Sequence, residues 1–175
     1  MKKSLMILIA AMTIAATAAA QPRAIGLRLG SGDEVSYQHS ISEKGFLQAD
    51  AGFYSWFRGI ELTATYNHIL FTPSWTEYGE WNFSVGGGIG GGYAWSVPNA
   101  LIYGDNFSYG WIGLVPVAQL SFKFEFPLQL AVDFRPNIGV DIVEKGRNWV
   151  NTNGSRVKYH TDGLYDLALS VRYTF

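Results

Sequence analysis

The chain has 175 residues, of which 13 are basic and 14 are acidic, so its formal net charge is −1. Because charged residues are few and no basic run exists, nucleic acid is excluded as an expected partner. The chain has no cysteine, which excludes a disulfide framework, thiol chemistry and a lipid anchor attached to cysteine.

Residues 1–20 are predicted to be a secretory signal peptide. Lys2 and Lys3 form a positive start, an apolar and small-residue stretch follows, and Ala18-Ala19-Ala20 offers a cleavage site before Gln21. A retained transmembrane helix is the alternative, but the apolar stretch is short for one. The remaining residues, 21–175, have a length that suits a single domain.

The next four segments alternate apolar with polar residues, as expected of β-strands with two unlike faces. In residues 60–68, for example, Ile60 and Leu62 alternate with Glu61 and Thr63. The four predicted strands are 25–30, 34–40, 47–54 and 60–68.

The glycine-rich stretch "WNFSVGGGIGGGYAW", residues 81–95, is predicted to be a fifth strand. Its odd positions are mainly aromatic or aliphatic, and its even positions are small or polar. A nucleotide-binding loop is the alternative, but neither a Lys-Ser/Thr pair nor a helical pattern follows the glycines.

Three more alternating segments, 111–125, 128–140 and 165–175, complete eight predicted strands and an all-β chain. The charged residues within the eight windows all fall on the polar faces. They are Arg28, Glu34, Asp50, Glu61, Lys123, Glu125, Asp133, Arg135, Asp166 and Arg172.

The faces are predicted to be inverted relative to a soluble barrel, with apolar side chains outward to lipid and polar ones inward. The polar faces mix cations with anions, as a self-neutralising interior would, and the segments are long enough for tilted membrane crossings. Aromatic residues near the segment ends predict an interfacial girdle, formed by Trp81, Trp95, Phe122, Phe124, Tyr165, Tyr173 and Phe175. A soluble, lipocalin-like barrel is the alternative.

An eight-stranded antiparallel up-and-down barrel is the predicted architecture, because in hydrocarbon every strand edge must be paired. The interior of such a barrel is just wide enough for side chains to fill. We expect the even glycines of 81–95 to leave room there for bulky or long inward side chains such as Trp111, Arg135 and Arg172.

The C-terminal segment "YDLALSVRYTF" resembles the targeting strand of Gram-negative outer-membrane barrels. Residues 23–175 as a whole resemble small eight-stranded barrels of the OmpA-transmembrane/OmpX type. The stretches "AIGLRLG", "EVSYQHSIS" and "FPLQLAVDFRPNIGV" are similar to a family of uncharacterised outer-membrane barrel proteins. This resemblance implies location in the cell outer membrane, insertion by the barrel assembly machinery, and a periplasmic position for both termini.

Counting strands from a periplasmic C-terminus divides the connections into two sets. The expected outer loops are 31–33, 55–58, 96–110 and 141–164. The expected periplasmic turns are 41–46, 69–80 and 126–127, of which 69–80 is long for a turn, and its Trp75 and Tyr78 are candidates for the interface.

The three histidines give a weak case for catalysis. A His-x-Ser pair, as in lipid A deacylase barrels, would let an imidazole activate a hydroxyl, but neither His39, His68 nor His160 has serine two residues on. His160 with Asp162 fits a metal site or a base, although a solvated loop is the simpler expectation. No catalytic residue, metal or cofactor is therefore predicted.

The inward charges are predicted to form a network in the lumen. Its members are Arg28, Glu34, Asp50, Glu61, Lys123, Asp133, Arg135 and Arg172. We expect a packed plug of ion pairs, because a buried charge is tolerated only when it is paired; a proton path or narrow pore is the alternative.

These features predict a monomeric outer-membrane barrel with a structural or surface-interaction role through loops 96–110 and 141–164. Its expected partners are outer-membrane lipid and lipopolysaccharide, and its surface ligand is left open. The alternatives are a lipid A-modifying enzyme, either deacylase or acyltransferase, and a narrow passive pore.

Overall fold

The computed structural model describes residues 22–54, 58–98, 106–143, 157–160 and 163–175, and these form strands and connections without helices. No helix within these ranges could therefore cross a membrane. The predicted signal peptide, residues 1–20, lies outside them. The strands are β1 (Arg23–Leu29), β2 (Gly32–Ser40), β3 (Gly45–Tyr54), β4 (Gly59–Phe71), β5 (Gly79–Pro98), β6 (Asn106–Phe124), β7 (Leu128–Phe134), β8 (Ile138–Val143), β9 (Val157–His160) and β10 (Leu167–Thr174).

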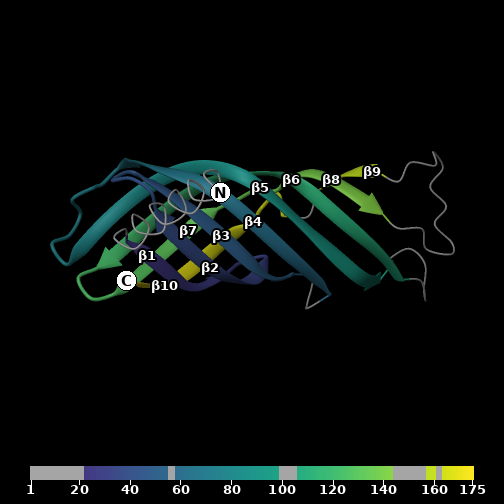
Figure 1. Cartoon of the computed structure of the whole chain (residues 1–175), viewed down its shortest axis with the longest axis horizontal. Coiled ribbons are helices and arrows are strands. Elements are labelled where there is room, and N and C mark those ends of the chain that lie inside the picture. The colour runs from purple at the N-terminus through teal and green to yellow at the C-terminus, as the bar shows by residue number, and fades with distance from the viewer. Residues whose placement is uncertain (1–21, 55–57, 99–105, 144–156, 161–162) are drawn as a thin grey trace, which may run out of the picture.

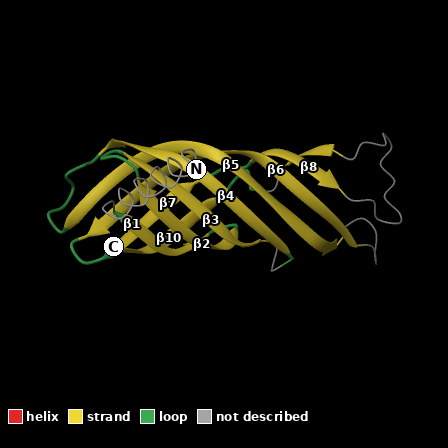
Figure 2. Ribbon diagram, in the orientation of Figure 1, coloured by secondary structure: helices red, strands yellow, loops and turns green. Residues whose placement is uncertain are grey.

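The strands close into an eight-stranded antiparallel up-and-down barrel, as predicted (Figures 1 and 2). β1 to β6 each pair with the next strand in the chain, and β10 pairs with both β1 and β7. The ten strands fill eight positions around the barrel wall, and we call each position a stave. β7 and β8 share one stave because both pair with β6 along its length, and β9 and β10 share the next because they pair with β8 and β7 respectively.

β1 begins and β10 ends at one end of this barrel, which we call the terminal end. Ala24 pairs with Thr174, and the Arg23 N–H donates to the carbonyl of Phe175 at 2.9 Å. The β2–β3, β4–β5 and β6–β7 connections are at the same end, because Gly79 pairs with Phe124 and Ser40 with Phe46. We call the opposite end the far end.

The last two staves are interrupted, which corrects the prediction of one continuous strand over 128–140, whereas β10 covers residues 167–174 of the predicted strand 165–175 without a break. Pro136 has no N–H to donate, so it interrupts a ladder, and Gly163 adopts a φ of 88° opposite it. Two backbone bonds hold the gap together: Arg135 N–H donates to Asp166 at 2.8 Å, and Asn137 N–H donates to Gly163 at 3.1 Å.

Several predicted connections are shorter than expected because strand pairing continues into them. The turn predicted at 69–80 spans only 72–78, since β4 runs to Phe71 and β5 starts at Gly79. The outer loops predicted at 96–110 and 141–164 include strand residues 96–98, 106–110, 141–143 and 157–160. Residues 55–57, 99–105, 144–156 and 161–162 of the predicted loops lie outside the described ranges.

The described apolar faces point outward and the polar faces inward. Leu27, Leu62 and Ile89 are 53 %, 68 % and 63 % exposed. Of the ten strand-window charges, eight are buried, whereas Lys123 and Glu125 are exposed at the terminal end. This is the arrangement predicted for an inverted barrel, and the opposite of a soluble barrel.

Four strands continue past the rest of the barrel at the far end (Figure 1). β5 has 20 residues and β6 has 19, against 7 in β1. At ~3.3 Å per residue β5 is roughly 65 Å long, whereas a tilted crossing needs ~9–11 residues. We call the far-end portions of β5 and β6, together with β8 and β9, the protruding sheet.

Candidate functional site

The interior of the barrel is closed by ion pairs centred on Arg28, which extends inward from β1. Its Nε and Nη2 atoms donate to Asp133 Oδ1 of β7 at 3.0 and 2.7 Å. Nη2 also donates to Asp166 Oδ2 at 2.7 Å, and Nη1 to Glu34 Oε2 at 3.2 Å. Arg28 therefore holds three carboxylates from three different parts of the wall, with a side-chain exposure of 0 %.

Arg135 is the second centre of this network. Its Nη2 donates to both oxygens of Glu34 at 2.7 Å, and its Nη1 donates to Asp50 Oδ2 at 2.6 Å. Glu34 thus bridges the two arginines across the lumen. Charge-assisted bonds of this kind are shorter and stronger than neutral ones, so the network fixes β1, β2, β3 and the β7–β8 gap relative to one another.

Asp166, in the gap between β9 and β10, belongs to the same network although it was not included in the predicted set. Besides Arg28, it accepts from the N–H and the hydroxyl of Ser31 at 3.2 and 2.9 Å. The one sequence feature that pointed to an inward position for Asp166 was its place on the polar face of the predicted strand 165–175. Its side-chain hydrogen-bond partners, Arg28 and Ser31, are more than 130 residues away in the chain, so spacing could not reveal them.

Three predicted members lie outside these ion pairs. Arg172 is fully buried, but it donates to the hydroxyls of Ser36 and Ser170, each at 3.0 Å, rather than to a described carboxylate. Glu61 is buried on β4, and Glu34 is among the charged groups that act on it. Lys123 lines a cavity of about 190 Å³ at the terminal end together with Arg23, Glu43 and Glu80, and it takes no part in the ion pairs described above.

We call the side chains of Arg28, Glu34, Asp50, Asp133, Arg135 and Asp166 the plug. Arg28 and Arg172 are both 0 % exposed, so neither side chain borders a space large enough for a water molecule. Each carboxylate of the plug touches a guanidinium, as buried charges require. The plug can brace the wall through these ion pairs.

Beyond the plug, the glycine row of β5 makes room for a large inward side chain. A Cβ built on Gly90 would come within 2.9 Å of Cη2 of Trp111 and 3.0 Å of Cγ2 of Val115. Trp111 of β6 is 4 % exposed. The sequence-based expectation that these glycines accommodate Trp111 is correct at Gly90.

His160 is not in a solvated loop, which corrects the expectation for this residue. It ends β9, is 5 % exposed, and its Nδ1 lies 2.6 Å from Oδ1 of Asp141 on β8. Its ring stacks on Trp111, with centroids 4.7 Å apart and planes at 9°. Asp162, the partner considered from the sequence, lies outside the described residues.

An imidazole held by a carboxylate is the arrangement of a general base, but catalysis also needs a nucleophile within reach. The hydrogen-bond partner described for His160 is the carboxylate of Asp141, which is not a nucleophile of this kind. Nor do the described ranges bring three or more His, Cys, Asp or Glu side chains together in a way that could hold a metal ion.

Five of the seven aromatic residues predicted for the girdle gather at the terminal end. Trp81 lies against Phe122 with ring centroids 4.8 Å apart, Phe122 against Phe124 at 4.6 Å, and Tyr173 stacks near Phe175 at 6.2 Å. Trp75 and Phe126, from the turns, extend this cluster. The other two, Trp95 and Tyr165, are exposed but lie toward the far end of β5 and in the β9–β10 gap.

Comparison of the chain with protein-family models, with curated proteins and with solved structures found no match in any of the three.

Proposed function

We propose that this protein is an outer-membrane barrel that acts at the cell surface through its protruding sheet. The observation that carries the proposal is the sheet itself, in which strands continue past the closed barrel. Because β1 begins and β10 ends at the opposite end, a periplasmic C-terminus puts the protruding sheet outside the cell.

The outward apolar face supports the membrane location. A soluble monomer rarely exposes large contiguous apolar patches, yet here Ile25, Leu62, Leu114 and Ile138 are each 46 % exposed or more on different staves. The aromatic cluster at the terminal end fits a membrane–water interface, where Trp and Tyr are enriched. Closure of the barrel leaves few backbone groups to be unpaired in hydrocarbon.

The edges of the protruding sheet support a role in binding. In the described part of the chain, β9 has β8 as its only strand neighbour, and β5 has no β4 partner beyond Trp95. An unpaired edge offers backbone N–H and C=O groups to an added strand. On β9, Val157 and Tyr159 are 53 % and 86 % exposed, so side chains are also available to a partner.

The plug supports a surface role over transport, since the lumen is filled where a pore would need to be open. A lipid A-modifying enzyme is the second candidate, and the Asp141–His160 pair is the observation in its favour. Because the described residues supply this pair but no nucleophile identified with it, this candidate ranks below surface binding.

The test uses intact Gram-negative cells that express the full chain, compared with cells that lack it. We measure retention of the cells on surfaces coated with lipopolysaccharide, with polysaccharide or with matrix protein. The variant Tyr159→Lys changes the edge of the protruding sheet, and Tyr78→Lys is its matched control, because Tyr78 is similarly exposed at the terminal end. A gel shift between unheated and boiled samples checks that each variant is a folded barrel.

We expect the native chain and Tyr78→Lys to increase retention on at least one surface, and Tyr159→Lys to lower that gain several-fold. Equal retention with and without the chain on every surface would overturn the proposal. A changed acyl pattern of lipid A, read by mass spectrometry of the same cells, would instead establish the enzyme. Step conductance of the purified chain in planar bilayers would establish a pore.

A further inference from the structure

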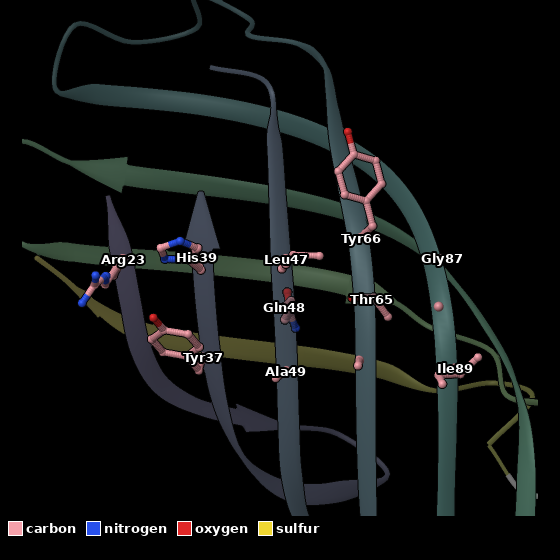
Figure 3. A pocket seen from close by; sticks show the side chains of 12 residues that line it. Arg23, Tyr37, His39, Leu47, Gln48, Ala49, Thr65, Tyr66, Gly87 and Ile89 are labelled. Carbon is pink, nitrogen blue, oxygen red and sulfur yellow. The ribbon is translucent and has the colours of Figure 1, made fainter. Parts of the chain in front are cut away.

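A groove crosses the outward face of β2, β3, β4 and β5 (Figure 3). It consists of two adjoining hollows of about 720 and 730 Å³, which share Tyr37, Ala49, Ala64 and Ile89. Ala49 pairs directly with Ala64 in the ladder between β3 and β4. The floor of the groove is lowest at this pair because the neighbouring outward side chains are larger. We call the two hollows together the wall groove.

The residues around the floor give the wall groove its sides. Leu47 and Tyr66, which are a cross-strand pair, stand toward the terminal end, and Leu62 stands toward the far end. Gly87 and Gly91 of β5 extend the low floor beside Tyr66 and Leu62, their ladder partners. Apolar side chains and backbone therefore line nearly all of the groove.

The polar end of the wall groove is formed by Arg23 and His39. These two residues are register partners on β1 and β2 at the terminal end, and both line the hollow. Figure 3 shows them together with Tyr37 on one side of it. The Tyr37 and His39 rings are nearly parallel, with centroids 6.4 Å apart.

We propose that the wall groove binds one phospholipid, with an acyl chain along Ala49 and Ala64 and its phosphate at Arg23 and His39. The inference rests on the membrane location proposed above. The wall groove is separate from the protruding sheet, so the phospholipid is a ligand in addition to any surface partner.

The shape of the wall groove favours an acyl chain over a second copy of the protein as its occupant. Two barrels are convex cylinders that would meet along a line, so the wall of a second copy would leave a hollow floored by alanine unfilled. A flexible hydrocarbon chain can follow the floor, and the two hollows are of a size typical for ligand sites, about 300–1,000 Å³. An acyl chain that fills the hollows makes more van der Waals contacts with their apolar lining than loosely packed bulk lipid would make.

The charge of the polar end of the wall groove favours a phosphate as the group bound there. Guanidinium groups bind phosphate with paired, charge-assisted bonds, and an imidazole beside one adds a further ring N–H. The terminal end faces the periplasm in the proposed orientation, and the lipid of that leaflet is phospholipid. The polar end and the apolar floor therefore match the two parts of one glycerophospholipid.

The test uses the full chain, folded in micelles, with one equivalent of palmitoyl-oleoyl-phosphatidylglycerol added. Native mass spectrometry counts the lipid that remains bound as collision energy is raised. The double variant A49L/A64L fills the floor, and A118L is its control, because Ala118 is an alanine on β6 that lines neither hollow. The single variant A64L is the milder change if the double variant does not show the gel shift of a folded barrel.

We expect one lipid per native chain, with at least ten-fold less retained by A49L/A64L and unchanged retention by A118L. Arg23→Gln should lower retention of phosphatidylglycerol several-fold and leave retention of diacylglycerol, which has no phosphate, unchanged. When purified lipopolysaccharide replaces phosphatidylglycerol, the native chain should retain less of it.

Equal retention by A49L/A64L and A118L, preferential retention of lipopolysaccharide, or a dimer mass that A49L/A64L abolishes would overturn the proposal. Because this assay contains no surface partner, its failure is distinguishable from failure of the cell-retention assay.

Discussion

The closed barrel and the protruding sheet are built from the same alternating strands, yet they solve the problem of exposed strand edges differently. In the barrel every stave has two hydrogen-bonded neighbours, with β10 joining β1 to β7. In the sheet, β9 has a neighbour on one side only among the described residues. The barrel is therefore complete in itself, whereas the sheet can still accept a partner.

Their inward sides differ as well. Inside the barrel, carboxylates and guanidinium groups from β1, β2, β3 and β7 meet in the plug. On the inner side of the sheet, Trp111 stacks on His160, which in turn pairs with Asp141. We infer that the plug fixes the shape of the barrel and that the sheet depends on local packing.

The largest expected effect comes from breaking the plug at its centre. Arg28→Met leaves Asp133, Asp166 and Glu34 short of a partner, and an uncompensated buried charge costs about 3–5 kcal/mol. Urea unfolding of the chain refolded into phospholipid vesicles, followed by tryptophan fluorescence, measures this loss. Lys123→Met is the control, because Lys123 is exposed and outside the plug, and it should change the free energy of unfolding by less than ~0.5 kcal/mol. Equal losses in the two variants would show that the plug does not support the barrel.

The second prediction concerns the room that β5 leaves for Trp111. Gly90→Ala places a methyl group against Cη2 of Trp111, and overpacking of this kind costs about 1–3 kcal/mol. Gly87→Ala is the matched control on the other face of the same strand, because its Cβ would meet nothing closer than 3.6 Å. The same unfolding assay should rank Gly87→Ala at or above the native chain, since alanine loses less backbone entropy than glycine. A neutral Gly90→Ala would mean that Trp111 has other space to occupy.

The third prediction concerns the aromatic cluster at the terminal end. Trp81 and Phe122 are cross-strand partners with ring centroids 4.8 Å apart, and aromatic pairs contribute about 0.5–1.5 kcal/mol beyond buried area. A double-mutant cycle of Trp81→Leu and Phe122→Leu in vesicles should yield a coupling energy in that range. Coupling near zero would indicate that each ring contacts lipid independently of the other.

The sequence was a good guide to the barrel, because a two-residue period reports directly which face a side chain occupies. The windows over 34–40 and 60–68 fall inside β2 and β4, and their predicted polar positions are buried, except for the half-buried Ser40 at the end of β2. The ends of strands were harder. The alternation weakens near Ile69 and around 96–110, where ladder pairing rather than composition extends β4, β5 and β6.

Contacts across the barrel could not be read from the chain. Asp166 pairs with Arg28 at a separation of 138 residues, and the sequence has no feature that selects this carboxylate over others of the same face. His160 looked solvated because its neighbours are polar, but β9 carries its ring inward onto Trp111. The break at Pro136 was visible as a proline in a strand pattern, and it should have divided the 128–140 window.

The smallest expected effect on global stability belongs to the protruding sheet. Asp141→Asn keeps the shape of the side chain and removes the charge beside His160, which weakens a bond of 2.6 Å. The staves below are closed by β7 and β10, which do not contact Asp141 through the ladder. The free energy of unfolding should therefore change by less than ~0.5 kcal/mol, the range of most substitutions outside a stability determinant.

The local effect of Asp141→Asn should nevertheless be measurable. Hydrogen exchange resolves regions that open independently of global unfolding, and the loss of one charge-assisted bond, about 1.5 kcal/mol, corresponds to roughly ten-fold faster exchange in β8 and β9. Exchange in β1 and β2 should be unchanged. If Asp141→Asn instead slowed or sped exchange equally in all strands, the sheet and the barrel would be one cooperative unit, and the sheet would not be free to rearrange around a partner without straining the plug.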